Sequence, residues 1–196
     1  MATRPGRLPN LRVVADSVEE LRASLKMLAE KEVLVGFPED TSARTDAETK
    51  SPVDITNAAL GYIHDNGAPE QNIPARPFMV PGILEARETL TRQLTSIARD
   101  VLLRRGVGAV DEGFERVGLR AQFALRKKIN EGIPPPLSEW TLRDRARRGR
   151  VGAMWELAWR EAGAPATTEL AKPLIDTGQL RNAINYVVRL RRNRRT

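Results

Sequence analysis

The residues of this chain that are best suited to chemistry form the Asp-Thr-Gly run at 176–178, which follows two apolar residues. Two aspartates held on such runs can share one proton and activate a water molecule for hydrolysis. A second copy of the chain would have to supply the other carboxylate. A structural use also fits, because Asp176 or Thr177 can cap a short helix and Gln179 then completes a capping box.

An aspartic protease is disfavoured by the sequence that follows Asp176. That fold needs a flap hairpin and a further glycine-bearing strand after its aspartate, whereas only 20 residues remain here and the last of them are rich in arginine. Gln179 also stands where a small residue is expected after the glycine. We therefore expect Asp176, Thr177 and Gln179 to act as capping residues without catalysis.

Other catalytic and metal-binding patterns are missing from the sequence. His64 is the only histidine and there is no cysteine, so neither residue type can complete a zinc site around it. No Gly-x-Ser-x-Gly motif and no glycine-rich phosphate loop occurs. We expect a structural His64, and no catalytic residue, cofactor or metal site.

The composition predicts a globular domain with an acidic partner. The 196 residues are 41% hydrophobic and 29% charged, which suits one domain, or one domain with extensions. No apolar run approaches the roughly 18 residues of a membrane span, and the basic, proline-rich start lacks the apolar stretch of a secretory signal. The net charge of +7 favours nucleic acid or an acidic protein surface as partner.

Much of the positive charge lies in two short stretches. The first arginine cluster contains Arg143, Arg145, Arg147, Arg148 and Arg150, and the second arginine cluster contains Arg189, Arg191, Arg192, Arg194 and Arg195. Near the expected end of a long helix, where cations suit the helix dipole, lie Arg126, Lys127 and Lys128. These residues could contact DNA phosphates, but a solvated helix face and a frayed tail would give the same pattern.

A stiff segment precedes the third expected helix, and we call it the strap: Ile73-Pro74-Ala75-Arg76-Pro77-Phe78. Each proline fixes its own φ and favours an extended residue before it. We expect the strap to set the entry into a helix that starts near Pro81, with Phe78 as its anchor. Arg76 should bond backbone carbonyls, a carboxylate such as Asp176, or a neighbouring subunit.

Apolar periodicity predicts an α+β domain of long helices packed on a small, mainly antiparallel sheet. The expected helices span 17–31, 54–65, 81–105, 111–131 and 138–148, a short helix follows residue 176, and the expected strands span 32–37 and 185–190. The expected irregular segments are an extended basic arm at 1–15, a long mobile loop at 38–52 and a basic tail at 191–196.

Small polar residues mark the expected helix starts, because their side chains can accept from free backbone N–H groups. These residues are Ser17, Asp54, Asp111 and Ser138. Trp155 and Trp159 are four residues apart, so a short helix would place both on one face. We expect that face to serve packing rather than base stacking.

Several short motifs occur in order along the chain: Val35-Gly36-Phe37-Pro38, Ala58-Ala59 with Ile63–Gly67, the strap, Ile129–Gly132, Pro135-Pro136-Leu137-Ser138 with Thr141, and Lys172–Arg181. In this order they resemble the tail-completion and virion-morphogenesis proteins of tailed bacteriophages, a neck or head–tail joining family. Each motif is weak alone, but their shared order is specific. The resemblance covers about residues 32–190.

The resemblance implies a small α+β protein that is not an enzyme. Such proteins generally act as ring subunits at the head-proximal end of the tail. They contact the connector or adaptor below the portal and the tail tube or tail terminator. It further implies a homo-oligomeric ring, a hexamer or dodecamer, through which the genomic DNA passes. The contacts with DNA would be non-specific in sequence, and no membrane would be a partner. The protein would be made in the host bacterial cytoplasm and would reside in the virion neck.

The resemblance also assigns roles to particular residues. It implies one domain at 16–190, with assembly motifs formed by Ile73, Pro74, Arg76, Pro77, Phe78, Asp176, Thr177, Gly178, Gln179, Leu180 and Arg181. Two features depart from the family: 149–169 is longer than the usual link, so we interpret it as a probable insertion, and Asp65 replaces the common glutamate after the histidine. The alternative function is a free nucleic-acid-binding protein that acts through the arginine clusters.

Overall fold

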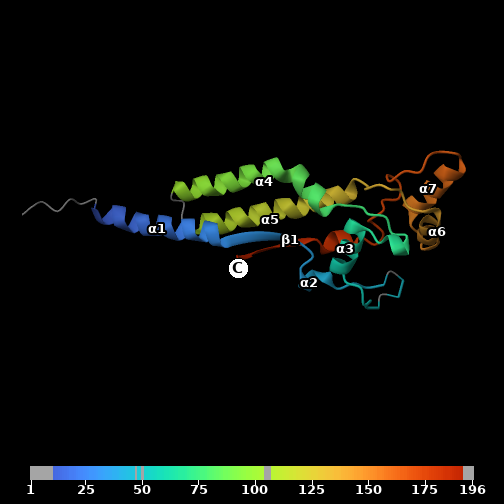
Figure 1. Ribbon diagram of the computed structural model, residues 1–196, viewed down its shortest axis with the longest axis horizontal. Coiled ribbons are helices and arrows are strands. Elements are labelled where there is room, and N and C mark those ends of the chain that lie inside the picture. Colours follow the sequence, from blue (N-terminus) through green and yellow to red (C-terminus); the bar gives the residue numbers. More distant parts are fainter. Residues whose placement is uncertain (1–10, 47, 50, 104–106, 192–196) are drawn as a thin grey trace, which may run out of the picture.

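The computed structural model describes residues 11–46, 48–49, 51–103 and 107–191. The chain forms an elongated body in which α1, α4 and α5 run along the long axis and α6 and α7 lie at one end (Figure 1). The elements, in order, are α1 (Leu11–Glu30), β1 (Lys31–Gly36), α2 (Glu39–Ser42), α3 (Asn57–Asn66), η1 (Pro69–Gln71, a 3₁₀ turn), α4 (Met79–Leu102), α5 (Val107–Asn130), α6 (Glu139–Arg147), α7 (Val151–Glu161), α8 (Gln179–Ala183) and β2 (Asn185–Leu190).

The two strands that the sequence predicted form a small antiparallel sheet. Lys31 pairs with Leu190 at one end of the ladder and Gly36 pairs with Asn185 at the other. The helix α5 packs on both strands, and the paired Val33 and Val188 both contact the apolar cluster beneath. The expected α+β class, with long helices packed on a small antiparallel sheet, is therefore confirmed.

The buried apolar residues form three clusters along the body. The first lies between α4 and α5 and contains Ile97, Val101, Val110, Phe114 and Val117. The second joins the strap to α5 and α8 and contains Phe78, Leu125, Ile129, Ile133, Leu174, Leu180 and Ile184. The third lies under α6 and α7 and contains Leu137, Leu142, Ala153 and Ala171. Phe78 therefore anchors the strap in the second cluster, as the sequence predicted.

Several helix ends lie where the sequence placed them. Gly67 follows α3 with φ 80° and its N–H bonds back to the carbonyl of Ile63, a left-handed conformation that suits glycine. Ser138 precedes α6, and its hydroxyl accepts from the backbone N–H of Thr141 at 3.3 Å. These two helix ends could be predicted from the sequence because each signal acts within one helical turn.

Three expected helix starts are wrong. The helix α1 begins at Leu11, so residues 11–15 are not an extended arm and Ser17 does not cap this helix; residues 1–10 lie outside the described part. Thr56 caps α3 in place of Asp54, with its side chain accepting from the N–H of Ala59 at 3.1 Å. Asp111 lies inside α5, where its carboxylate pairs with Lys31 of β1.

The segment 38–52 was expected to be a long loop without structure, and this is wrong in part. It contains the short helix α2 and an isolated antiparallel bridge between Thr45 and Pro52. Thr41 also donates its hydroxyl to the carbonyl of Ala183 at 2.9 Å. The loop is therefore anchored to α8 at one end.

The segment 149–169 contains α7, which packs against α6. The exposed fractions of Trp155 and Trp159 are 64% and 50%. The expectation that this pair serves packing inside the domain is therefore wrong. Within the described residues, no helix combines the length and the apolar character that crossing a membrane would require.

Candidate functional site

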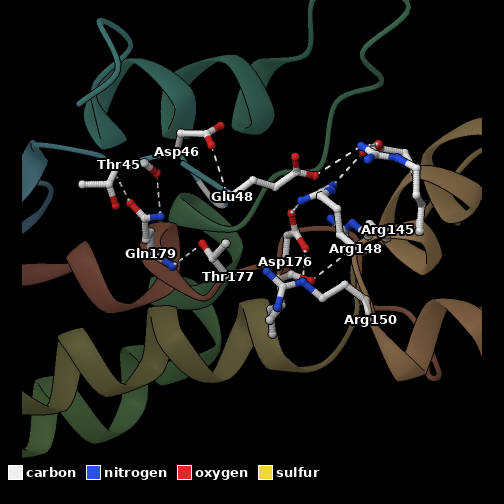
Figure 2. A network of polar contacts seen from close by, with 12 residues as sticks. Thr45, Asp46, Glu48, Arg145, Arg148, Arg150, Asp176, Thr177 and Gln179 are labelled. Carbon is white, nitrogen blue, oxygen red and sulfur yellow. Dashed lines mark hydrogen bonds and ion pairs between the residues drawn. The ribbon is translucent and has the colours of Figure 1, made fainter. Parts of the chain in front are cut away.

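Asp176 is held by two arginines from the junction between α6 and α7. Arg148 Nη1 donates to Asp176 Oδ2 at 2.6 Å, and Arg150 Nε donates to Oδ1 at 2.9 Å (Figure 2). Arg148 Nη2 also donates to Asp144 Oδ2 at 2.7 Å. The carboxylate therefore ties the segment after residue 172 to α6, and the expectation that Asp176 caps a helix is wrong.

The charge state of Asp176 follows from these partners. Burial by itself would raise the pKa of Asp176, but the hydrogen bonds from Arg148 and Arg150 and the positive charge of Arg145 hold it below its ordinary value. Two aspartates that share a proton need one carboxyl group that is readily protonated. The environment of Asp176 favours the opposite, fully ionised state.

The rest of the Asp-Thr-Gly-Gln motif shapes the start of α8. Gly178 occupies the cap position with φ 80°, a left-handed conformation, and has no side chain to accept from the helix. Thr177 Oγ1 accepts from the N–H of Gln179 at 3.3 Å, so Thr177 satisfies one free donor of this short helix. Leu180 enters the second apolar cluster, and Arg181 Nη1 donates to Asn130 Oδ1 at 3.1 Å.

The side chain of Gln179 does not complete a capping box. Its Oε1 accepts from the N–H of Thr45 at 3.0 Å and its Nε2 donates to the Thr45 carbonyl at 2.8 Å (Figure 2). The amide thus pairs with the backbone of the 38–52 segment as a neighbouring strand would. A contact across 134 residues has no local sequence signal.

Arg76 of the strap bonds to backbone carbonyls, one of the three kinds of partner expected for it. It is buried, and its Nε and Nη2 both donate to the carbonyl oxygen of Pro135 at 3.1 and 2.9 Å. Burial lowers the pKa of Arg76. The guanidinium group therefore fastens the strap to the proline segment that precedes α6.

Asp65 supports the other end of the strap. Its Oδ1 accepts from the backbone N–H groups of Phe78 and Met79 at 2.7 and 3.0 Å, where the first turn of α4 has free donors. The carbonyl of the adjacent His64 accepts from the N–H of Arg76 at 2.7 Å. The sequence reasoning missed Asp65 as a cap, because it lies 13 residues before the N–H that it serves.

Arg145 is the buried member of the first arginine cluster. Its Nη1 donates to the carbonyls of Lys172 and Ile175 at 3.0 and 2.8 Å, and its Nη2 donates to that of Pro173 at 2.9 Å. Burial is the main cause that lowers its pKa, whereas the charge of Asp176 opposes the shift. Arg145 therefore fixes the segment that presents Asp176.

The other basic residues of interest that the structure describes also have intramolecular partners. Their contacts are Arg143 with Glu139, Arg147 with Glu48 and Asp144, Arg126 with the carbonyls of Asn182 and Ile184, Lys127 with Glu131, Lys128 with Glu85 and Glu131, and Arg189 with Glu32. The backbone N–H of Arg191 bonds to the Glu30 carbonyl, whereas Arg192, Arg194 and Arg195 lie outside the described residues. Phosphate contacts would have to compete with these pairs.

A pocket of about 350 Å³ opens beside Asp176, and we call it the Asp176 pocket. Its walls come from the 44–55 segment, α3, α6 and the 173–180 segment. The charged residues of its lining are Arg44, Arg145, Arg148, Asp46 and Asp176, and the ring of His64 lies among them. The sequence did not predict Arg44 as a pocket residue, because it belongs to no recognisable motif.

His64 is kept neutral by its position in this pocket. Burial, followed by the charges of Arg76, Arg44 and Arg145, lowers the pKa of His64 to about 4. Its backbone carbonyl serves the strap, but its buried Nδ1 has no hydrogen-bond partner. The carbonyl contact does not depend on the side chain, so the structural role expected for His64 stays a prediction, while the ring faces a charged environment.

Known proteins give no further guide to this site. Among the described residues, no group of three or more His, Cys, Asp or Glu side chains is arranged to hold a metal ion. Comparisons with protein-family models, with curated proteins and with solved structures find no match for this chain. The site is therefore interpreted from its own chemistry.

Proposed function

We propose that this chain is a structural protein of the head–tail junction of a tailed bacteriophage, in which it forms a ring subunit around the DNA channel. The single observation that carries the proposal is that the motifs of the resemblance contact one another. Arg76 of the strap bonds the Pro135 carbonyl, and Arg181 of the last motif donates to Asn130 of the Ile129–Gly132 motif. Shared order along the chain and mutual contact in space both favour one inherited scaffold.

The chemistry of these motifs supports a scaffold role. Asp65 caps the start of α4, Arg76 donates to a backbone carbonyl, and Asp176 pairs with two arginines. These three side chains meet their partners within the same chain. Such groups stabilise one conformation of irregular segments, which is what a subunit needs when it must fit between two different neighbours.

The surface at the α6–α7 end supports contacts with partner proteins. Trp140 is 78% exposed, and Trp155 and Trp159 of α7 are also exposed. Tryptophan is enriched at protein interfaces and among the residues that contribute most to binding. We propose that this surface contacts another subunit, the connector or adaptor, or the tail tube or terminator.

The test of this function is a null mutant of the gene in the phage that encodes it. We expect DNA-filled heads and separate tails, with joining restored when the wild-type protein is supplied from a plasmid. The matched control is the null mutant that carries the empty plasmid, which should still give unjoined heads and tails. Joined, infectious virions from the null mutant would overturn the proposal.

Free nucleic-acid binding has weaker support as the main function. The arginine side chains of the two clusters bind carboxylates or carbonyls of the same chain at positions 143, 145, 147, 148, 150 and 189. Arg191 forms a backbone contact with Glu30. Binding to phosphates would make the affinity of the isolated chain for DNA fall steeply with salt. DNA binding that is weak and insensitive to salt would remove this alternative.

A further inference from the structure

The Asp176 pocket is lined by both basic and apolar side chains. Its lining includes Arg44, Arg145 and His64, polar and acidic residues such as Asp176, and a set of apolar side chains: Val53, Ile55, Leu60, Pro173, Leu174 and Leu180. Its volume of about 350 Å³ lies at the small end of the range for ligand pockets. A pocket of this size admits a small group and excludes a nucleic-acid duplex.

The arginines of the pocket differ in how well their donors are satisfied. Arg145 donates to three backbone carbonyls, and Arg148 donates to two carboxylates. In contrast, Nε and Nη1 of Arg44 are buried and have no hydrogen-bond partner. A buried charged donor without an acceptor is costly, so Arg44 is the group that would gain most from an added acceptor.

A second unpaired atom lies in the same pocket. The buried Nδ1 of His64 has no hydrogen-bond partner, and the charges of Arg44 and Arg145 act on the His64 ring. An anion placed between these groups would offset the charges of Arg44 and Arg145 and would accept a hydrogen bond from the Nδ1–H tautomer of the neutral His64 ring. Two independent side chains, from the 44–55 segment and from α3, therefore favour the same kind of ligand.

The net charge of the lining residues limits the charge of that ligand. Arg44, Arg145 and Arg148 oppose Asp46 and Asp176, while His64 is neutral, so the lining carries one net positive charge. Asp46 accepts three hydrogen bonds from its own turn, and Asp176 accepts from two arginines. A monoanion matches this balance better than a dianionic phosphate does.

We propose that the Asp176 pocket binds a carboxylate attached to a short apolar body, with the carboxylate on Arg44 and the body against the leucine-lined wall. The source would be the C-terminal residue of a polypeptide or a short aliphatic acid. The inference does not depend on the head–tail role, because it uses only the pocket and its unpaired donors.

The experiment titrates the full chain with N-acetylleucine, which imitates an apolar C-terminal residue, and with N-acetylleucinamide, which lacks the charge. We expect N-acetylleucine to raise the melting temperature in a saturable manner and the amide to have no effect at equal concentration and ionic strength. Hexanoate tests the aliphatic source, and whichever acid binds more tightly identifies the source. If neither acid raises the melting temperature, the proposal is wrong.

Variants of Arg44 locate the binding. Arg44→Gln should weaken the binding of the acid about tenfold or more, since a charge-assisted hydrogen bond is lost, and Arg44→Lys should retain part of it. Arg143→Gln, on the outer face of α6, is the matched control and should bind as the wild type does. Equal binding by Arg44→Gln and the wild type would overturn the proposal.

A measurement on the unmodified protein covers the case in which Arg44→Gln does not fold. His64 is the only histidine, so its imidazole gives one set of NMR signals. The acid should shift these signals with the same midpoint as the thermal titration. An acid that raises the melting temperature without shifting the His64 signals would place binding elsewhere, which contradicts the proposal.

Phosphate tests whether the pocket prefers a carboxylate. If phosphate binds through Arg44 as tightly as the acid does, the pocket is a general anion site, and this also contradicts the proposal.

Discussion

The part of the molecule built on the sheet and the part that contains the strap are held together by different contacts. In the first part, α1, α4 and α5 bury apolar side chains of the first cluster against Val33 and Val188. In the second part, buried polar groups join irregular segments: Arg76 to Pro135, Arg145 to the 172–175 carbonyls, and Glu156 to Thr167.

The difference has a physical cause. Helices and strands satisfy their own backbone groups, so only their apolar faces remain to be covered. The segments at 134–137 and 172–176 have no such ladder, and their carbonyls need donors from elsewhere. Arginine supplies several donors from one side chain, which explains why two buried arginines lie in the second part. The comparison teaches that the irregular segments of this chain are stabilised by buried polar donors in addition to the apolar packing of the second cluster.

The largest expected effect belongs to the apolar part. Phe114→Ala removes a nearly fully buried ring from the first cluster, and we expect a loss of about 4 kcal/mol in the free energy of unfolding. Urea denaturation measures it. Leu119→Ala on the same helix is the control, because Leu119 is exposed, and it should change stability by less than about 0.5 kcal/mol. Equal losses would show that the first cluster does not stabilise this part.

The polar part should be nearly as sensitive to one arginine. Arg145→Met keeps most of the side-chain volume but leaves three carbonyls without their donors, and we expect a loss of about 3 kcal/mol. The control is Arg143→Met on the same helix, where an exposed pair with Glu139 is lost and little should change. If the two variants have equal stability, the polar contacts do not hold this part together.

Acid should weaken the polar part before it weakens the apolar part. The pKa of His64 is about 4 in the folded chain and 6.5 in its ordinary state, so the unfolded chain binds more protons between these values. Stability from His64 is complete above pH 6.5 and falls by at most about 3 kcal/mol as the pH drops to 4. Urea denaturation from pH 7 to 4 measures this slope.

The control for the acid experiment is His64→Asn, which should flatten the slope over the same interval. The contribution of Asp176 to stability is lost at lower pH than that of His64. The pKa of Asp176 is lower in the folded chain than in the unfolded chain, so this contribution is complete above the pKa of the unfolded chain and is lost as the pH falls below it. An unchanged slope in His64→Asn would contradict the neutral, buried state of the ring.

The smallest effect should come from Gln179. Gln179→Ala removes both bonds to the Thr45 backbone, and we expect the Thr45 amide to exchange about fivefold faster or more, equivalent to about 1 kcal/mol. Hydrogen exchange measures this directly. Thr177→Val removes only the bond to the Gln179 N–H and should leave the Thr45 amide protected. Unchanged exchange in Gln179→Ala would mean that the amide does not anchor the 38–52 segment.

The sequence allowed prediction of local signals more fully than of contacts between distant segments. Runs such as Val33-Leu34-Val35 and signals such as Ser138 act over a few residues, so β1, β2 and the start of α6 were predicted. Asp176 was predicted as a local cap, but its partners are Arg148 and Arg150, 28 and 26 residues away. Contacts of this length depend on the completed fold, and neither residue type nor spacing reveals them.

The central claim is that this chain is part of the head–tail junction. The most direct test is electron cryo-microscopy of the virions that encode it, with a tag on the protein to locate it. We expect a ring of this fold between the connector and the tail tube, with its channel around the DNA. Absence of the protein from purified virions, or density for it at the tail tip or in the capsid shell, would contradict the claim.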